Sequence, residues 1–234
     1  MLDKAYEYLN SDRLLHIDML ETLERSIGEV IYAEDDGVAL KNGKITYMIS
    51  AKSEEALDKI CDAIGERPRL VVLHQQELEP ALQSRYGYSG TMACYQCAYL
   101  AKDRLEERVS EGIALSPIPM TELDFVVENY GHISDGKYIA SRIEEGMLGA
   151  FCGKELAGFI GSHEEGTIGL LHILPEYRRR GLGYSLEAAM INLMLDKGWV
   201  PHVHIVTTNE ASIQLQEKLG MAFSDKTLTW LYGE

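Results

Sequence analysis

The sequence predicts an α/β protein with a mixed sheet, arranged in two halves. Helical and strand patterns alternate along the chain, and a similar order of elements occurs twice. The segment 101–112, AKDRLEERVSEG, is almost wholly polar and separates an apolar strand from a new apolar run. We therefore expect two domains, at 1–105 and 106–234, although an amphipathic helix joining two packed halves also fits this segment.

The first half is expected to contain four strand segments and two helices. Alternating and β-branched residues predict strands at 29–41, 45–51, 69–74 and 92–100. Apolar residues at helical spacing predict helices at 53–65 and 77–87. Between the second strand and the first helix stand only Lys52 and Ser53, so this turn contains no glycine.

The second half has a longer order of elements. Helices are predicted at 121–130 and 138–146, followed by strands at 147–153, 156–165 and 167–175. A buried helix follows over 184–197, where the apolar residues keep i, i+3, i+4, i+7 spacing. A strand at 201–208, a helix at 209–219 that stops at Gly220, and a final hairpin of 221–225 with 227–233 complete the chain.

Charge and composition exclude several classes of protein. The 234 residues are 46% hydrophobic, and 22 Lys and Arg stand against 37 Asp and Glu, a formal net charge of −15. Nucleic acid and anionic membranes would repel such a chain. No apolar run approaches the roughly 18 residues of a membrane span, and the N-terminus lacks the apolar core of a leader peptide. We expect a cytoplasmic protein, monomeric or homodimeric, that binds neither nucleic acid nor membranes.

The cysteine and histidine patterns do not predict a metal site. Four cysteines are too few for a disulfide scaffold, which fits a reducing compartment. Cys94 and Cys97 form one CxxC, but on a strand residues three apart point to opposite faces. His202 and His204 share a strand face without a placed third ligand. We expect no bound metal and interpret the strand cysteines as buried.

The segment most informative about chemistry is LLHILPEYRRRGLGYSL, residues 170–186. A strand runs into Pro175, and three arginines then precede a Gly-Leu-Gly turn at the start of a helix. Glycines without Cβ let backbone N–H groups close around a phosphate, while the helix N-terminus and the arginines add positive charge. The alternative is a solvated charge run before an ordinary turn. The combination of strand, proline, Arg-x-x-Gly-x-Gly and amphipathic helix favours a pyrophosphate site.

With this motif the sequence resembles the GNAT superfamily of acyl-CoA dependent N-acyltransferases. Its signature, Q/R-x-x-G-x-G/A, is matched by Arg178, Gly181 and Gly183, and the similarity covers about residues 112–234. LPEYRRRGLG and NEASIQLQEKLG are most similar to the glycine N-acyltransferase-like branch, which carries a degenerate GNAT-like N-terminal domain. The resemblance therefore implies a GNAT fold in the C-terminal half and a degenerate, GNAT-like N-terminal half without a cofactor site.

The resemblance also implies which residues bind acetyl-CoA or another acyl-CoA. Ile173 and Leu174 would pair with the pantetheine arm, and one of their N–H groups would stabilise the oxyanion. Asn209 and Ser212 would reach the cofactor near its thiol. Amides of the turn would hold the pyrophosphate, and the cofactor residues expected there are Arg178, Arg179, Arg180, Gly181, Leu182, Gly183 and Tyr184.

Two positions depart from the family pattern. Thr167 stands where many relatives have a glutamate base, and Gln216 stands where many have a tyrosine acid. Glu165 is the preferred substitute base, since neighbouring carboxylates raise one another's pKa. Glu164 and His172 are the alternatives to it, and Tyr184 is an alternative acid. Solvated hairpin residues and a structural histidine are the competing interpretations.

The sequence thus predicts an enzyme that moves an acyl group, expected to be acetyl, from acyl-CoA to a primary amine. The amine attacks directly in a ternary complex. One alternative is a non-catalytic acyl-CoA binding module that kept the phosphate turn. Another is a protein N-acetyltransferase, for which the acidic charge would favour basic peptides. The acceptor pocket is expected in the variable region 121–146.

Overall fold

The computed structural model describes residues 1–131, 133 and 135–233. The chain forms two compact units, and neither follows the sequence without interruption. The first consists of Met1–Ala98, His204–Gln214 and Met221–Glu234, and the second of Tyr99–Val203 and Leu215–Gly220. None of the described helices combines the length and apolar character that a membrane span requires.

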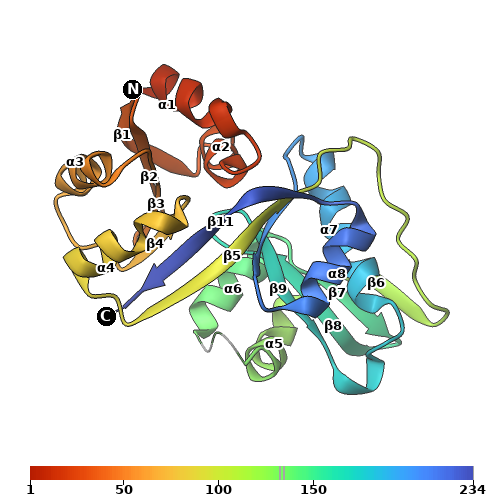
Figure 1. Ribbon diagram of the computed structural model, residues 1–234. Helices are drawn as coiled ribbons and strands as arrows, with labels where there is room; N and C mark the ends of the chain where they lie inside the picture. The colour runs from red at the N-terminus through yellow and green to blue at the C-terminus, as the bar shows by residue number, and fades with distance from the viewer. Residues whose placement is uncertain (132, 134, 234) are drawn as a thin grey trace. The chain divides into compact units, whose positions relative to one another are not determined.

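A sheet with the strand order β1-β2-β3-β4-β11-β5-β10 organises the first unit (Figure 1). Strands β3 and β4 run parallel, and β11 is antiparallel to both β4 and β5. The strands are β1 (Gly28–Glu34), β2 (Gly37–Asn42), β3 (Thr46–Ala51), β4 (Leu70–Leu73), β5 (Gly90–Ala98), β10 (His202–Val206) and β11 (Ala222–Tyr232). The helices are α1 (Leu2–Leu9), α2 (Ile17–Glu24), α3 (Glu54–Ile64) and α4 (Glu79–Tyr86).

Strand alternation divides the core of this unit into two layers. Side chains of one set of alternate residues pack with α1 and α2, and those of the other set pack with α3 and α4. The first set includes Val38, Leu40, Met48 and Val72, and the second includes Ala39, Ile49, Val71 and Leu73. All of these are fully buried, so helices cover both faces of the central strands.

The C-terminal strand β11 is the main departure from the predicted architecture. It is one strand of 11 residues instead of the predicted hairpin, with a register irregularity between Phe223 and Thr227. Both of its edges are hydrogen-bonded inside the first unit, to β4 and to β5. The compact units therefore divide the chain differently from the predicted domains 1–105 and 106–234.

The second unit is built on an antiparallel sheet in the order β6-β7-β8-β9. These strands are β6 (Ile113–Pro117), β7 (Leu148–Cys152), β8 (Glu155–Ser162) and β9 (Ile168–Ile173). Helices α5 (Leu123–Asn129) and α6 (Gly136–Glu145) share a core with this sheet that includes Ile143, Leu156, Phe159 and Leu170. Helix α7 (Leu182–Asp196) packs along β7, β8 and β9, and α8 (Glu210–Leu219) contributes residues to both units.

The predicted element order is largely present. The series β3-α3-β4-α4-β5 repeats the series β9-α7-β10-α8-β11, as expected from the duplicated pattern. Helices α1 and α2 were outside the predicted elements. The polar segment around 101–110 forms neither helix nor strand, so the alternative of an amphipathic connecting helix is wrong.

A fragment of residues 106–234 is expected not to fold on its own. It would leave both edges of β11 without β4 and β5, and would expose the buried side chains of Leu228 and Leu231. Circular dichroism and amide NMR dispersion, with the full chain as control, measure this. A fragment that melts cooperatively with dispersed amide signals would contradict the importance of this strand pairing.

Candidate functional site

The predicted phosphate turn connects β9 to α7. After β9 the chain makes a single 3-10 turn, η4 (Pro175–Tyr177), and then extends at Arg178. The backbone of Arg179 and of Gly181 is left-handed, with φ of 59° and 79°. Glycine adopts this conformation at little cost, whereas other L-residues are strained by it. The sequence Arg-Arg-Gly thus produces the sharp reversal that starts α7, which we call the phosphate turn (residues 175–183).

The first amides of α7 have no side-chain cap. No side chain caps the helix at Gly181, and the N–H of Ser185 bonds back to the carbonyl of Gly181 at 3.1 Å. Helix geometry leaves the preceding N–H groups, those of Leu182, Gly183 and Tyr184, without intrahelical acceptors. A Cβ built on Gly181 would meet no described atom within 4 Å, and one on Gly183 only the Leu215 side chain, at 3.8 Å. A side chain at either glycine would enter the open space beside the start of α7.

Three exposed arginines surround this turn. The guanidinium Nε of Arg178 donates to the carbonyl of Ile173 at 3.0 Å and fastens the turn to the end of β9. The guanidinium of Arg180 lies 5.4 Å above the Tyr177 ring. Together with the helix N-terminus these cations suit a group with two or more negative charges.

The open edge of β9 carries a second set of backbone groups. Strand β9 lies at the edge of its sheet and has one extra residue between the pairs Phe159–His172 and Gly161–Gly169, with Leu170 at φ 54°. The N–H of Leu174 donates to Ala157 O at 3.0 Å, so the prediction that it can serve as a free donor is wrong. Alternation along the strand directs the N–H of Ile173 to the open edge.

The polar segment before β6 is bound along α7, and we call residues 104–110 the strap. The buried Asn192 accepts from the N–H of Leu105 at 2.8 Å and donates to its carbonyl at 2.9 Å. Ser185, also buried, donates to the carbonyl of Arg108 at 2.7 Å. These two α7 side chains explain how a polar, irregular segment keeps a fixed course.

The strap ends beside the phosphate turn. The hydroxyl of Ser110 donates to the carbonyl of Arg180 at 3.3 Å. The guanidinium of Arg108 lies 5.0 Å above the ring of Tyr184, in the first turn of α7. The Tyr184 ring is therefore engaged with a cation next to the turn, which adds to the positive charge at this end of the helix.

The predicted base candidates differ in their surroundings. Glu164 is exposed, whereas Glu165 is buried and its carboxylate accepts from the Thr167 hydroxyl at 2.6 Å. Adjacent to them, the hydroxyl of Tyr138 and Nδ1 of His163 are 2.7 Å apart. Burial and then the charge of Glu165 raise the pKa of Tyr138. The structure brings an α6 side chain to the β8–β9 turn, a proximity that sequence spacing does not show.

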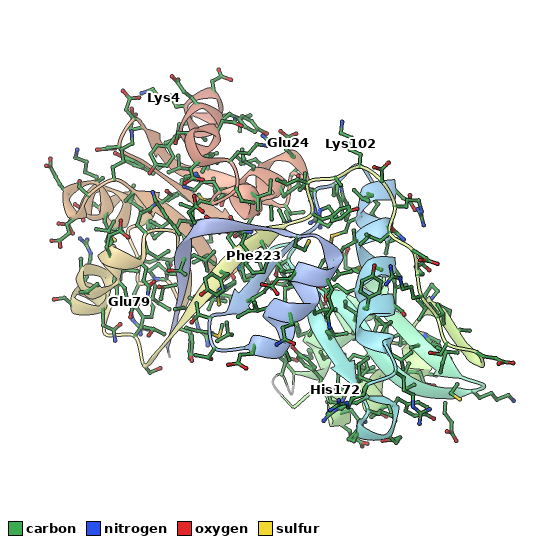
Figure 2. The ribbon with its side chains drawn as sticks, turned by 45° about the vertical axis from the view of Figure 1, so that its right-hand side comes forward. Lys4, Glu24, Glu79, Lys102, His172 and Phe223 are labelled. Atoms are coloured by element: carbon green, nitrogen blue, oxygen red, sulfur yellow. The ribbon has the colours of Figure 1, made fainter. Side chains whose placement is uncertain are left out.

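The other predicted side chains lie on different elements. His172, labelled in Figure 2, is half-buried on β9. Its ring stacks on that of Phe159, with centroids 5.4 Å apart. Asn209 precedes α8 and its side-chain oxygen accepts from the N–H of Ser212 at 3.1 Å, as a helix cap does. The N-terminal end of α8 belongs to the first compact unit. The predicted cofactor contacts of Asn209 and Ser212 remain predictions.

A buried polar pair links α7 to α8. Nε2 of Gln216 donates to the Glu187 carboxylate at 2.6 Å, and both side chains are at most 3% exposed. Burial raises the pKa of Glu187 to about 7, against the lowering effect of the Gln216 bond. The sequence singles out Gln216, because it stands where many proteins that the sequence resembles have a tyrosine, but it does not single out Glu187. Glu187 could have been found in the sequence as an acidic residue directly beside the apolar helix face that includes Leu186 and Met190.

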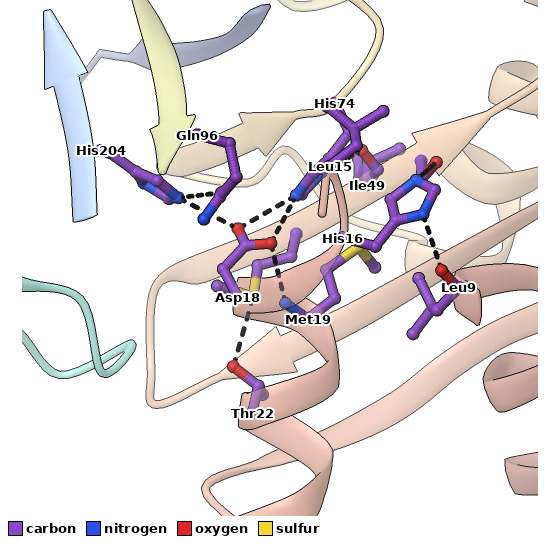
Figure 3. A network of polar contacts seen from close by, with 12 residues as sticks. Leu9, Leu15, His16, Asp18, Met19, Thr22, Ile49, His74, Gln96 and His204 are labelled. Carbon is purple, nitrogen blue, oxygen red and sulfur yellow. Dashed lines mark hydrogen bonds and ion pairs between the residues drawn. The ribbon is translucent and has the colours of Figure 1, made fainter. Parts of the chain in front are cut away.

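A second buried network lies in the first unit (Figure 3). Nε2 of His74 is 2.8 Å from the Asp18 carboxylate, and its Nδ1 is 3.0 Å from Ile49 O. Both ring nitrogens face acceptors, so the ring carries two protons. Burial opposes that charge, but Asp18 outweighs it and raises the pKa of His74. The same burial and the charge of His74 lower the pKa of nearby His16 to about 4.

Among the described residues this network and the cysteines form no metal site. Nε2 of His204 is 2.7 Å from the Gln96 side-chain oxygen, and Trp230 donates to its Nδ1 at 3.1 Å. Both nitrogens of His204 are therefore used by protein groups. Cys94 and Cys97 are buried, and burial raises the pKa of the Cys94 thiol to about 12.

Comparison with known proteins gives the class of the fold. Residues 147–231 match the family model described as FR47-like protein. A solved Drosophila protein is 17% identical with a TM-score of 0.65, covering 83% of this chain and 73% of that one. A GCN5-related N-acetyltransferase from Kribbella flavida is 12% identical, with a TM-score of 0.62 and 95% of each chain covered.

A GCN5-related N-acetyltransferase-like protein from Streptococcus suis is 17% identical, with a TM-score of 0.55, covering 98% of this chain and 99% of that one. No curated protein matches the sequence. The fold is therefore the mixed α/β GNAT fold of these neighbours.

The stability of the protein is expected to depend on the ionisation of Glu187. Its folded pKa of about 7 lies above the value of 4.5 for an ordinary glutamate, so the folded state binds more protons between these values. The free energy of unfolding should therefore fall as pH rises from about 4.5 to 7, by about 3 kcal/mol. Glu187→Gln should remove this contribution. Urea unfolding of both proteins across this range measures it, and identical pH profiles would contradict it.

Proposed function

We propose that the protein is an N-acyltransferase that moves an acyl group, acetyl in the first instance, from acyl-CoA to a primary amine. The phosphate turn carries the proposal: its uncapped amides, open glycine positions and arginines together suit a diphosphate. The GNAT-family neighbours support an acyl-CoA dependent transferase. The finer relation to the glycine N-acyltransferase-like branch is part of this proposal.

The residues of the turn and of β9 would divide the work of binding. The N–H groups from Arg179 to Tyr184 and the arginine side chains would hold the diphosphate of the cofactor. The open edge of β9, next to Ile173, would pair with the pantetheine arm. Bound acyl-CoA supplies an activated thioester. The N–H of Ile173, which the strand directs outward, would stabilise negative charge on the acyl oxygen without a catalytic side chain.

A base must take a proton from the amine, because only the neutral amine is nucleophilic. We propose Glu165 for this role, with Glu164 and His172 as alternatives. The Thr167 hydroxyl holds one Glu165 oxygen and leaves the other to accept a proton. Burial of Glu165 limits competition from bulk water.

A non-catalytic acyl-CoA binding module is the second candidate. It is favoured by the residues at the family's acid and base positions: Gln216 has no acidic proton, and Thr167 is not a base. The two candidates differ in whether the protein transfers the acyl group: the enzyme does, and the binding module does not. Thiol release from acetyl-CoA, measured with a panel of small amines and with basic peptides, tests them. Amine-dependent release supports the enzyme, and cofactor binding without release supports the module.

Substitution Gly181→Asp is expected to weaken acetyl-CoA binding by a factor of ten or more. It places a carboxylate in the open space before the α7 amides, where it would repel the diphosphate. Calorimetry measures the affinity. Gly153→Asp is the matched control, because Gly153 is also exposed at positive φ, 63°, in the β7–β8 turn. Unchanged affinity in Gly181→Asp, or equal loss in the control, would contradict the site.

Substitution Glu165→Gln is expected to lower the rate at neutral pH by roughly 10²-fold while cofactor affinity stays the same, because it keeps size and removes basicity. The deficit should shrink at high pH, since an amine with a pKa of about 10 is then increasingly neutral without help. Steady-state rates from pH 6 to 10 measure this, and Glu164→Gln and His172→Ala, measured in the same way, test the two alternative bases. A full neutral-pH rate in Glu165→Gln would exclude it as the base.

A further inference from the structure

Gln216 offers a buried hydrogen-bond acceptor that the protein does not use. Its Nε2 is fixed by the Glu187 carboxylate, but its Oε1 is buried and has no hydrogen-bond partner within the described part of the chain. Leaving a buried polar atom unpaired costs free energy, so such an atom in a binding region indicates a missing donor. An N–H, O–H or S–H donor would satisfy this oxygen.

The pair lies close to the phosphate turn along α7. Gly183 and Glu187 are four residues apart, so they share one face of the helix at a separation of about 6 Å along its axis. The Leu215 side chain, next to Gln216 in sequence, is 3.8 Å from where a Cβ of Gly183 would stand. This part of α8 therefore flanks the same face of α7 that begins at the turn.

We propose that the side-chain oxygen of Gln216 accepts a hydrogen bond from the pantetheine arm of acyl-CoA, and that Glu187 positions it. The inference rests on the proposed function, which places the diphosphate at the turn and the arm beyond it. An amide N–H of the arm supplies the missing donor. Gln216 is then a binding residue that contacts the pantetheine arm of the cofactor and does not contact the nucleotide.

Glu187 fits the role of a positioning residue. A glutamine side chain can turn its oxygen and nitrogen ends around, and only a bond to one end fixes the other. An acceptor at Glu187 holds the NH₂ end and so presents the oxygen. Other polar groups that contact α7 are engaged elsewhere. Glu107 accepts from Asn192, Arg104 donates to Asp196, and the guanidinium of Arg108 lies over the Tyr184 ring.

Two ligands distinguish binding of the pantetheine arm from binding of the nucleotide. Acetyl-CoA carries both, whereas adenosine 3′-phosphate 5′-diphosphate carries the diphosphate without the arm. We expect Gln216→Leu to weaken acetyl-CoA binding by a factor of about 3 to 10, the usual effect of one lost hydrogen bond, and to leave the affinity for the nucleotide unchanged. Calorimetry of the full chain measures both.

The control variants address folding. Gln214→Leu makes the same change at an exposed site on α8 and should alter neither affinity. Since Gln216→Leu leaves the Glu187 carboxylate buried without its partner, the double variant Glu187→Met with Gln216→Leu replaces both by apolar groups and should fold. It should show the same selective loss for acetyl-CoA, and its nucleotide affinity reports an intact turn.

Equal affinities of wild type and double variant for acetyl-CoA would overturn the inference while leaving the proposed function standing. A parallel loss for both ligands would also overturn it, because the pair would then only support the turn. Failure of the wild-type chain to bind acetyl-CoA at all would overturn the proposed function itself, and this inference with it.

Discussion

The structure depends on one local constraint, the left-handed backbone at the start of α7. Because Gly181 adopts φ 79°, the chain reverses sharply after β9 and α7 begins with no side chain over its first amides. Those N–H groups need an acceptor, and neighbouring positive charge makes an anion the best one. The strap, held by Asn192 and Ser185, ends at the same place. These features of the second unit are the basis for the anion site that we propose there.

The first unit shows what the same series of elements does without this constraint. Between β3 and α3 the turn is short, and the Ser53 hydroxyl caps the helix by accepting from the N–H of Ala56 at 3.2 Å. Glu54 and Glu55 add negative charge to the first turn. At the end of β3, the N–H of Ala51 donates to the Gln75 side chain. Protein groups occupy the places where the second copy offers open amides, so we interpret the first unit as structural support.

The sequence predicted the local features and missed the non-local ones. Arg178, Gly181 and Gly183 identify the turn because adjacent residues determine a turn and a helix start. The insertion of β11 between β4 and β5 joins residues more than 120 positions apart, which no local pattern encodes. The N–H of Leu174 is hydrogen-bonded inside the sheet because the bulge in β9 shifts the strand register, and the sequence does not show this bulge. The Glu187–Gln216 pair requires the packing of α7 against α8.

The central claim is that acyl-CoA binds once per chain, at the phosphate turn. Titration of isotope-labelled protein with CoA, followed by backbone amide NMR, tests it most directly. The account predicts saturation at one equivalent, with the largest shifts at the amides of Arg179 to Tyr184 and little change at Lys52 to Ala56. Saturation at two equivalents, or the largest shifts in the β3–α3 turn, would contradict it.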